Sequence, residues 1–368
     1  MIIPFHNIQR FFLKNQEQIQ KLSLKIYSTG KVVAGKETEE LEKNLCALNG
    51  RKYAVTTGSC TDALYFALYA TGLKPKDEIF IPAFSFIASL SSVVRAGLVP
   101  VFCDINSKSF MLNLQDAENK ITKKTKAILA VNLFGATLNK FELENFAKKN
   151  NLLLIEDAAQ SLGNPHQEFK WGSIGKASCL SFDPTKIVGV YGSGGAVLTD
   201  DGAIYETVKK LRYHGKDMNT GQFTCLGYNS QISEFDAALL NYQLNFLDKI
   251  VEERNKIASI YCNELSNIPE IILPEINSNP SSFHKFVIRV SFRDKLEKVL
   301  SEAGIQTMKH FSYTLDEANF LKEFSHKAEN IKIAQQIKNQ VLSLPIYPEL
   351  TEQEIRFVCA SIKKIFKK

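Results

Sequence analysis

Short apolar runs alternate with amphipathic segments between residues 50 and 200. The apolar runs fall at 53–55, 78–81, 99–102, 127–131, 152–155, 177–181 and 196–198. Helical periodicity lies between several of them, at 62–71, 86–96 and 140–150. Continuous apolar strands separated by helices are typical of a mostly parallel sheet that is covered on both faces. The pattern therefore predicts a large α/β domain.

The pattern changes in the last third of the chain. Residues 232–265 have the spacing of one long helix, and a Pro/Asn/Ser-rich connection follows at 269–280. An alternating strand is expected at 283–290, with helices at 294–303 and 351–366. We therefore expect a large domain at 1–245 and a smaller C-terminal α+β domain at 246–368.

Composition narrows the class of protein. The 368 residues are 45% hydrophobic and 23% charged, which is typical of a soluble globular chain. The net charge is only +6 and the basic residues are scattered, so no nucleic-acid groove is expected. No apolar run approaches the length of a membrane span, so no membrane partner is expected.

The cysteines and histidines indicate reduced thiols and no metal site. The seven cysteines are dispersed and form no CxxC pair, and the six histidines have no metal-binding spacing. Unpaired, scattered cysteines favour a cytoplasmic location.

Two candidate residues follow strands of the predicted sheet. Asp157 follows the run at 152–155, and Lys186 lies a few residues beyond the run at 177–181. Ligands of such sheets collect at the carboxyl ends of the strands. A lysine that forms a Schiff base and an aspartate that pairs with a pyridinium nitrogen are what pyridoxal phosphate (PLP) requires. Alternatively, Lys186 is a solvated cation and Asp157 a helix N-cap or half of a buried ion pair.

Residues around these two could complete such a site. Ser59 and Cys60 join a strand to a helix whose N-terminus could hold a phosphate, although Ser59 could equally be an ordinary N-cap. Phe86 could stack on a flat ring, although core packing is the commoner role of a phenylalanine. Four glycines at 189–195 match no nucleotide-binding fingerprint, and we interpret them as the turn that lets Lys186 approach a cofactor.

These motifs, in this order, make the chain resemble the DegT/DnrJ/StrS family of PLP-dependent sugar aminotransferases. The resemblance runs nearly from end to end. It rests on residues 3–5 (IPF), 58–64 (GSCTDAL), 81–88 (IPAFSFIA), 99–104 (VPVFCD), 155–160 (IEDAAQ), 181–186 (SFDPTK), 212–215 (RYHG), 227–229 (GYN) and 342–345 (LSLP).

The resemblance implies a fold-type I aminotransferase that forms a homodimer with shared active sites. It implies that Lys186 forms the Schiff base with PLP and moves the proton. It implies that Asp157 binds the ring nitrogen, that Gln160 contacts the O3′ side of the ring and that Phe86 stacks on the ring. It also implies that the phosphate is held by Ser59, Cys60 and Ser181, and that Asn229 reaches the phosphate of the neighbouring subunit.

The expected reaction moves an amino group from L-glutamate onto a nucleotide-linked keto-sugar. A cyclitol aminotransferase and a non-catalytic PLP-binding regulator are the alternatives. Three positions depart from the family pattern: Asn132 stands where a histidine is frequent, Gln231 where an arginine is usual, and the 309–313 loop lacks the usual proline. These departures leave the sugar specificity open.

Overall fold

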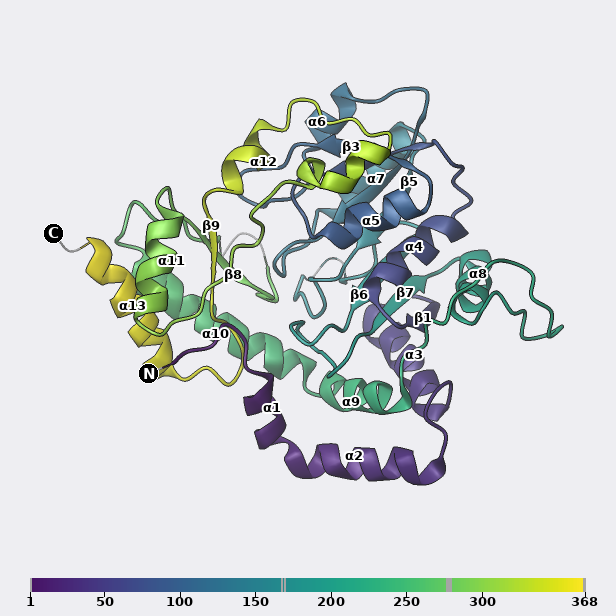
Figure 1. Cartoon of the computed structure of the whole chain (residues 1–368), viewed down its shortest axis with the longest axis horizontal. Helices are drawn as coiled ribbons and strands as arrows, with labels where there is room; N and C mark the ends of the chain where they lie inside the picture. Colours follow the sequence, from purple (N-terminus) through teal and green to yellow (C-terminus); the bar gives the residue numbers. More distant parts are fainter. Residues whose placement is uncertain (1, 167, 169, 276–279, 367–368) are drawn as a thin grey trace.

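A seven-stranded sheet forms the centre of the computed structural model, which describes residues 2–166, 168, 170–275 and 280–366 (Figure 1). The strand order is β1-β7-β6-β5-β4-β2-β3. Strand β7 runs antiparallel to both neighbours, and the other pairs are parallel. The strands are β1 (Tyr53–Thr57), β2 (Glu78–Pro82), β3 (Val99–Cys103), β4 (Thr125–Val131), β5 (Leu153–Asp157), β6 (Ala177–Ser181) and β7 (Gly195–Thr199).

All seven apolar runs form strands of this sheet, so the mostly parallel α/β prediction is confirmed. The run at 177–181 matches β6 as predicted, and each of the other runs differs from its strand by one or two residues at one or both ends. One two-residue extension carries β5 through Asp157, which becomes the last residue of its strand.

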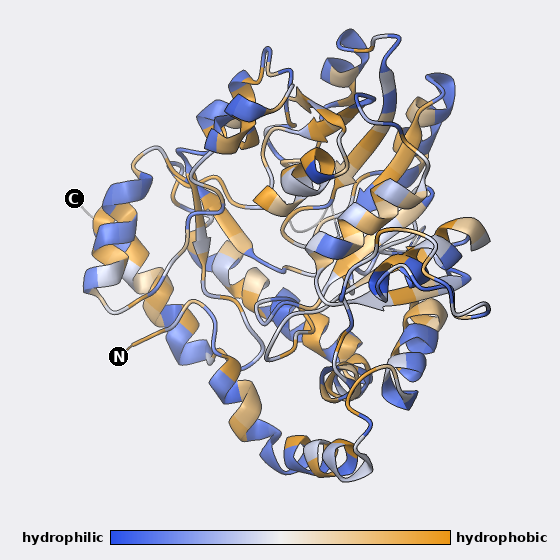
Figure 2. Cartoon of the chain, turned by 45° about the vertical axis from the view of Figure 1, so that its right-hand side comes forward, coloured by the Kyte–Doolittle hydropathy of each residue, from blue (hydrophilic) through white to orange (hydrophobic). Residues whose placement is uncertain are grey.

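Successive residues of each strand enter cores on opposite faces of the sheet. Ile155 packs in one core, whereas Leu154 packs in another on the far face. Both faces are apolar because both are covered by helices, and Figure 2 shows the strands as hydrophobic ribbons between helices of mixed polarity. One face is covered by α4 (Cys60–Ala70), α5 (Ile87–Arg95) and α8 (Gly202–Arg212). The other is covered by α3 (Lys36–Asn49), α6 (Leu114–Asn119), α7 (Lys140–Lys149) and α9 (Glu234–Leu244).

The prediction of a single helix at 232–265 is wrong. Helix α9 ends at Leu244, and α10 (Leu247–Leu265) begins after a break at Asn245 and Phe246. The apolar period continues through the break, which is why the sequence reads as one helix. The two helices pack differently: α9 lies against α3, while most of α10 belongs to a separate C-terminal core.

That C-terminal core surrounds a small second sheet. Strands β8 (Phe286–Arg289) and β9 (Val341–Leu344) pair antiparallel, and α11 (Arg293–Glu302) and α13 (Glu352–Phe366) pack beside them. The expected alternating strand at 283–290 is shorter than predicted, and the side chains of both its faces are buried. Part of the connection at 269–280, residues 276–279, lies outside the described residues.

The segment from Phe311 to Val341 returns to the large sheet. Its apolar side chains pack in the core that holds α4 and α5, and Lys327 forms a bridge with Val101 of β3. The segment contains two 3₁₀ turns and α12 (Lys332–Ile337). We propose that the chain divides near Asn245, with this segment as the part of the C-terminal unit that holds the two units together.

The N-terminal segment also joins the C-terminal core. Ile3 pairs with Ile305 and is fully buried there, before α1 (Ile8–Lys14) and α2 (Gln16–Thr29) run along the outside of the large unit (Figure 1). Leu24 and Tyr27 of α2 are largely exposed. No described helix combines the length and the apolar character needed to cross a membrane.

Candidate active site

The predicted site residues gather at one edge of the large sheet. Strands β5 and β6 are parallel and end there at Asp157 and Ser181. Thr57 at the end of β1 pairs with Gly195, which in turn pairs with Ser181. The edge therefore brings together segments that are far apart in the sequence.

Asp157 is held rigidly at this edge. Its Oδ2 accepts a hydrogen bond of 2.7 Å from the Ser89 hydroxyl, and its Oδ1 accepts one of 3.1 Å from the backbone N–H of Ala159. Burial raises the pKa of the Asp157 carboxyl, and Ser89, Ala159 and Lys186 oppose that rise. A buried carboxylate in this setting favours a positively charged partner.

Lys186 lies close enough to Asp157 for the two charges to affect each other. Burial lowers the pKa of the Lys186 amine, while Cys60, Asp183 and Asp157 act in the opposite direction. The amine is thus surrounded by protein although part of the residue remains exposed. The two residues therefore lie near each other, as their positions after two strands of the sheet predicted.

The glycines that follow Lys186 have different roles. A Cβ at Gly189 would lie 2.6 Å from the Asp183 carbonyl oxygen, so this turn needs a residue without a side chain. A Cβ at Gly195 would lie 2.5 Å from the Cys60 nitrogen, so glycine lets β7 approach the start of α4. At Gly192 the nearest atom would be 3.9 Å away, and packing does not require glycine there.

The start of α4 contains Ser59 and Cys60. Ser59 is the N-cap, and its hydroxyl accepts a hydrogen bond of 3.1 Å from the Asp62 N–H. The Asp62 carboxylate accepts a hydrogen bond of 2.7 Å from the Ser230 hydroxyl and forms an ion pair of 2.7 Å with Arg95. Ser59 therefore caps α4, and the N-terminus of this helix lies at the edge that carries Gly195.

The aromatic and amide side chains near this edge differ in exposure. Phe86 leaves 51% of its surface exposed, and its ring centroid lies 6.1 Å from that of Phe311. Gln160 is buried, and its Oε1 accepts a hydrogen bond of 2.8 Å from the Phe134 N–H.

Asn229 is exposed, and its side chain accepts a hydrogen bond of 3.4 Å from Gln231. The next residue, Ser230, accepts a hydrogen bond of 3.0 Å from Gly58, so the Asn229 segment lies beside the start of α4 in its own subunit. Gln231 thus interacts with Asn229 at the position where the family usually has an arginine.

The other two departures also have structural explanations. Asn132 is fully buried; its amide donates to Glu156 at 2.6 Å, and its carbonyl accepts from the Leu138 N–H at 2.8 Å. In the 309–313 loop, Lys309 pairs with Asp294 and Glu297 of α11, whereas Phe311 is buried against the aromatic residues of the site.

Sequence reasoning missed a group of basic side chains near Lys186. Lys285 and His284 are buried just before β8, and His310 and His6 approach from other segments. Burial and the neighbouring cations lower the pKa of Lys285, of His310 to about 3, and of His6 to about 4. The adjacent His-Lys pair in an apolar strand was the signal that could have drawn attention to them.

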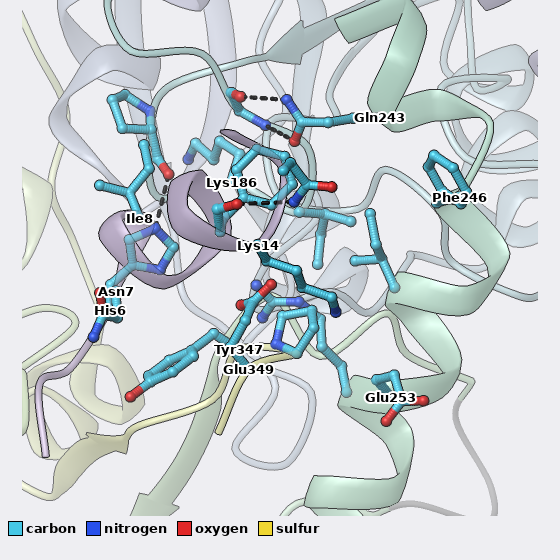
Figure 3. A pocket seen from close by; sticks show the side chains of 18 of the residues that line it. His6, Asn7, Ile8, Lys14, Lys186, Gln243, Phe246, Glu253, Tyr347 and Glu349 are labelled. Atoms are coloured by element: carbon cyan, nitrogen blue, oxygen red, sulfur yellow. Dashed lines mark hydrogen bonds between the residues drawn. The ribbon is translucent and has the colours of Figure 1, made fainter. Parts of the chain in front are cut away.

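A cavity of about 440 Å³ borders the Lys186 segment on the side of α1, α9 and α10 (Figure 3). His6 Nε2 donates to the Pro184 carbonyl at 2.9 Å, and Gln243 donates to the Gly189 carbonyl at 2.7 Å, so both stabilise the turn that carries Lys186. Asp157 is not among the residues that line this cavity. No cluster of described residues has the composition of a metal site.

Comparisons with known proteins identify the family of the chain. Residues 14–363 match the model of the DegT/DnrJ/EryC1/StrS aminotransferase family. A "pleiotropic regulatory protein" of Geobacillus stearothermophilus is 31% identical over 100% of this chain and 99% of its own. A UDP-N-acetyl-3-dehydro-α-D-glucosamine 3-aminotransferase of Acidithiobacillus ferrooxidans is 31% identical over 98% of this chain and 97% of its own.

Among solved structures, DesV of Streptomyces venezuelae, in complex with a ketimine intermediate, superimposes with a TM-score of 0.95 at 28% identity. The match covers 100% of this chain and 99% of that one. By the family model and by relatives that align over their full length, this chain belongs to the DegT/DnrJ/EryC1/StrS aminotransferase family.

Proposed function

We propose that this PLP-dependent aminotransferase moves an amino group from L-glutamate onto a nucleotide-linked keto-sugar. The observation that carries the proposal is the Lys186 amine beside the buried Asp157 carboxylate. The substrate class is supported by the Acidithiobacillus ferrooxidans relative, which is named for a 3-aminotransferase acting on a UDP-linked 3-dehydro sugar.

The residues at the sheet edge fit PLP. The buried Asp157 suits a protonated ring nitrogen, the exposed ring of Phe86 offers a stacking surface, and the N-terminus of α4 suits a phosphate. When bound, PLP supplies an electron sink that makes the proton on the adjacent carbon of an amino acid removable.

Lys186 is proposed as the base and acid of the reaction. Because burial lowers the pKa of its amine, a larger fraction of the free amine is neutral near pH 7 than in water. The neutral amine can take a proton from the donor carbon and return one to the sugar carbon. Asp157 would remain ionised when it pairs with a cationic ring nitrogen, because that charge would offset the cost of burying the carboxylate.

The remaining residues are proposed to position the cofactor. Ser59, Cys60 and Ser181 would hold the phosphate, the first two from the start of α4 and the third from the end of β6. Gln160 would face the O3′ side of the ring through its amide nitrogen, since its oxygen already accepts from Phe134.

We further propose a cytoplasmic homodimer in which Asn229 reaches the phosphate of the neighbouring subunit. The exposure of Asn229 in the single protomer supports this role. The exposed apolar side chains Leu24 and Tyr27 of α2 suit a contact surface between the subunits.

Two alternative functions differ from this proposal, one in its substrate and the other in the absence of turnover. A cyclitol aminotransferase would use the same cofactor residues, and a PLP-binding regulator would bind the cofactor without turnover. The Geobacillus relative is named as regulatory, whereas the closeness of Lys186 and Asp157 in this chain supports turnover. Incubation with glutamate and a panel of nucleotide-linked keto-sugars and keto-cyclitols, with NMR of the products, separates the three.

The decisive variant is Lys186→Arg, with the exposed Lys295→Arg as its control. Arginine stays protonated and cannot act as the base, so turnover should fall by at least about 10²- to 10⁴-fold. The visible absorption of lysine-bound cofactor should disappear as well. Turnover at the wild-type rate in Lys186→Arg would disprove the assignment.

A further inference from the structure

A second buried amine lies beside the Lys186 turn. Lys285 is 7% exposed, its Nζ donates a hydrogen bond of 3.5 Å to the Thr185 carbonyl, and it lies 5.0 Å from the ring centroid of Phe5. Within the described part of the chain, no carboxylate lies within ion-pair distance of Lys285. The acidic residue whose charge raises the pKa of the Lys285 amine is Asp183, which is exposed.

The neighbours of Lys285 are also basic. Lys186 and Arg254 both lower the pKa of the Lys285 amine, after burial itself. His284 is buried in the same group, and neither of its ring nitrogens has a hydrogen-bond partner among the described residues. Because buried cations are costly unless they are paired, this concentration of positive charge favours a bound anion.

The hydrogen-bond pattern identifies which histidine can donate a hydrogen bond to an anion. His6 donates from Nε2 to the Pro184 carbonyl, so in its neutral form the other nitrogen is an acceptor and does not suit an anion. His310 Nδ1 lies 2.9 Å from the Ser343 hydroxyl, and if that hydroxyl donates to Nδ1, His310 Nε2–H remains as a donor.

We propose that Lys285, assisted by His310, forms a subsite for the carboxylate of the amino donor. This inference rests on the proposed function, because it needs an amino acid as substrate. The subsite lies on the C-terminal unit, just before β8 and in the 309–313 loop, and faces the turn that carries Lys186.

The position favours the donor carboxylate over the diphosphate of the sugar nucleotide. In an α-amino acid the carboxylate is attached to the carbon that bears the reacting nitrogen, so it must lie close to the place of the Lys186 amine. In a nucleotide-linked sugar the diphosphate is attached at the anomeric carbon, and the sugar ring separates it from a more distant keto carbon. A cation adjacent to Lys186 therefore matches the amino acid.

The test compares Lys285→Met with Lys285→Arg and with the exposed control Lys295→Met. Enzyme loaded with cofactor is titrated by calorimetry with succinate, a dicarboxylate that has no amino group, and separately with UDP. Lys285→Met should weaken succinate binding and raise the KM for glutamate roughly 10- to 100-fold. Lys285→Arg should retain most of the binding because it keeps the charge, and Lys295→Met should match the wild type.

The half-reaction with the keto-sugar is the internal comparison. When it is started from enzyme that carries the aminated cofactor, its rate and apparent affinity should be nearly unchanged in Lys285→Met. Loss of UDP affinity with unchanged succinate affinity would assign the cluster to the diphosphate and overturn the proposal. Unchanged binding of both, or no succinate binding by the wild type, would also overturn it.

Failure of the subsite and failure of the proposed function give different results. An enzyme that transaminates no amino acid, but whose succinate binding still depends on Lys285, would lack the proposed function and keep the carboxylate subsite. Misfolding is checked by thermal unfolding without ligand. Lys285→Met should unfold at the wild-type temperature or above it, because the variant no longer buries an unpaired charge.

Discussion

The Ser89 hydroxyl donates a hydrogen bond of 2.7 Å to Asp157 Oδ2 and thereby connects α5 to the end of β5. Ser89 also lies 3.0 Å from the hydroxyl of Ser85, and both serines are buried. The bond lowers the pKa of the Asp157 carboxyl, in opposition to burial. Ser89, which the sequence motifs did not single out, thus helps to keep the carboxylate charged where the cofactor nitrogen is expected.

Removal of this hydroxyl should make cofactor binding more sensitive to acid. In Ser89→Ala the pKa of Asp157 rises further, so its proton is retained to a higher pH and the attraction to a cationic ring nitrogen is lost earlier as the pH falls. We expect the PLP affinity at mildly acidic pH to drop roughly 3- to 10-fold, with a smaller change at higher pH. Dissociation constants measured across pH give the result. Ser91→Ala, on the same helix, should follow the wild-type curve, and identical curves for both variants would contradict the role of Ser89.

Phe86→Ala should weaken the cofactor complex without destabilising the free protein. The ring is already 51% exposed, so its removal costs little packing, whereas stacking on a flat ring contributes about 0.5–1.5 kcal/mol, or roughly 2- to 12-fold in affinity. The measurements are the PLP dissociation constant and the melting temperature without PLP. Phe141→Ala, at a site that is 53% exposed on α7, is the matched control. An unchanged PLP affinity in Phe86→Ala would exclude stacking.

Asn132→Ala should destabilise the fold. The substitution removes one of several hydrogen-bond partners of buried Glu156 and leaves the Leu138 N–H without its acceptor, which should cost about 1–3 kcal/mol in the free energy of unfolding. Urea unfolding gives the value, and the exposed Asn263→Ala should change it by less than about 0.5 kcal/mol. Wild-type stability in Asn132→Ala would show that the buried network tolerates the loss.

Mixed dimers should reveal whether the active sites are shared. Lys186→Arg lacks the base, and Asn229→Asp places a negative charge where the phosphate of the neighbouring subunit is expected, so each variant alone should be inactive. After the two are unfolded together and refolded, one site in each mixed dimer has both native residues, and activity should return in part. A mixture of Lys186→Arg with Lys186→Met cannot recover activity and serves as the control. If the first mixture stays inactive, Asn229 does not act across the interface.

Local patterns in the sequence were sufficient to predict the sheet and the proximity of Asp157 and Lys186. Buried strands of a covered sheet are apolar along their whole length, and residues that follow parallel strands meet at one edge, which is why Asp157 and Lys186 could be placed together. The same local reasoning failed at Asn245 and Phe246. The apolar period continues across this break, and only packing against two different cores separates α9 from α10.

The sequence by itself determined the α/β class and the edge at which Lys186 and Asp157 come together, because these depend on side-chain periodicity and on short motifs. Only the tertiary structure showed that Ser89 supports Asp157 and that Lys285, His284 and His310 lie beside Lys186. These residues come from α5, from the two positions just before β8 and from the 309–313 loop, and no spacing along the chain records that they meet. The cost of burying an unpaired charge depends on its neighbours in space, and that neighbourhood exists only in the folded chain.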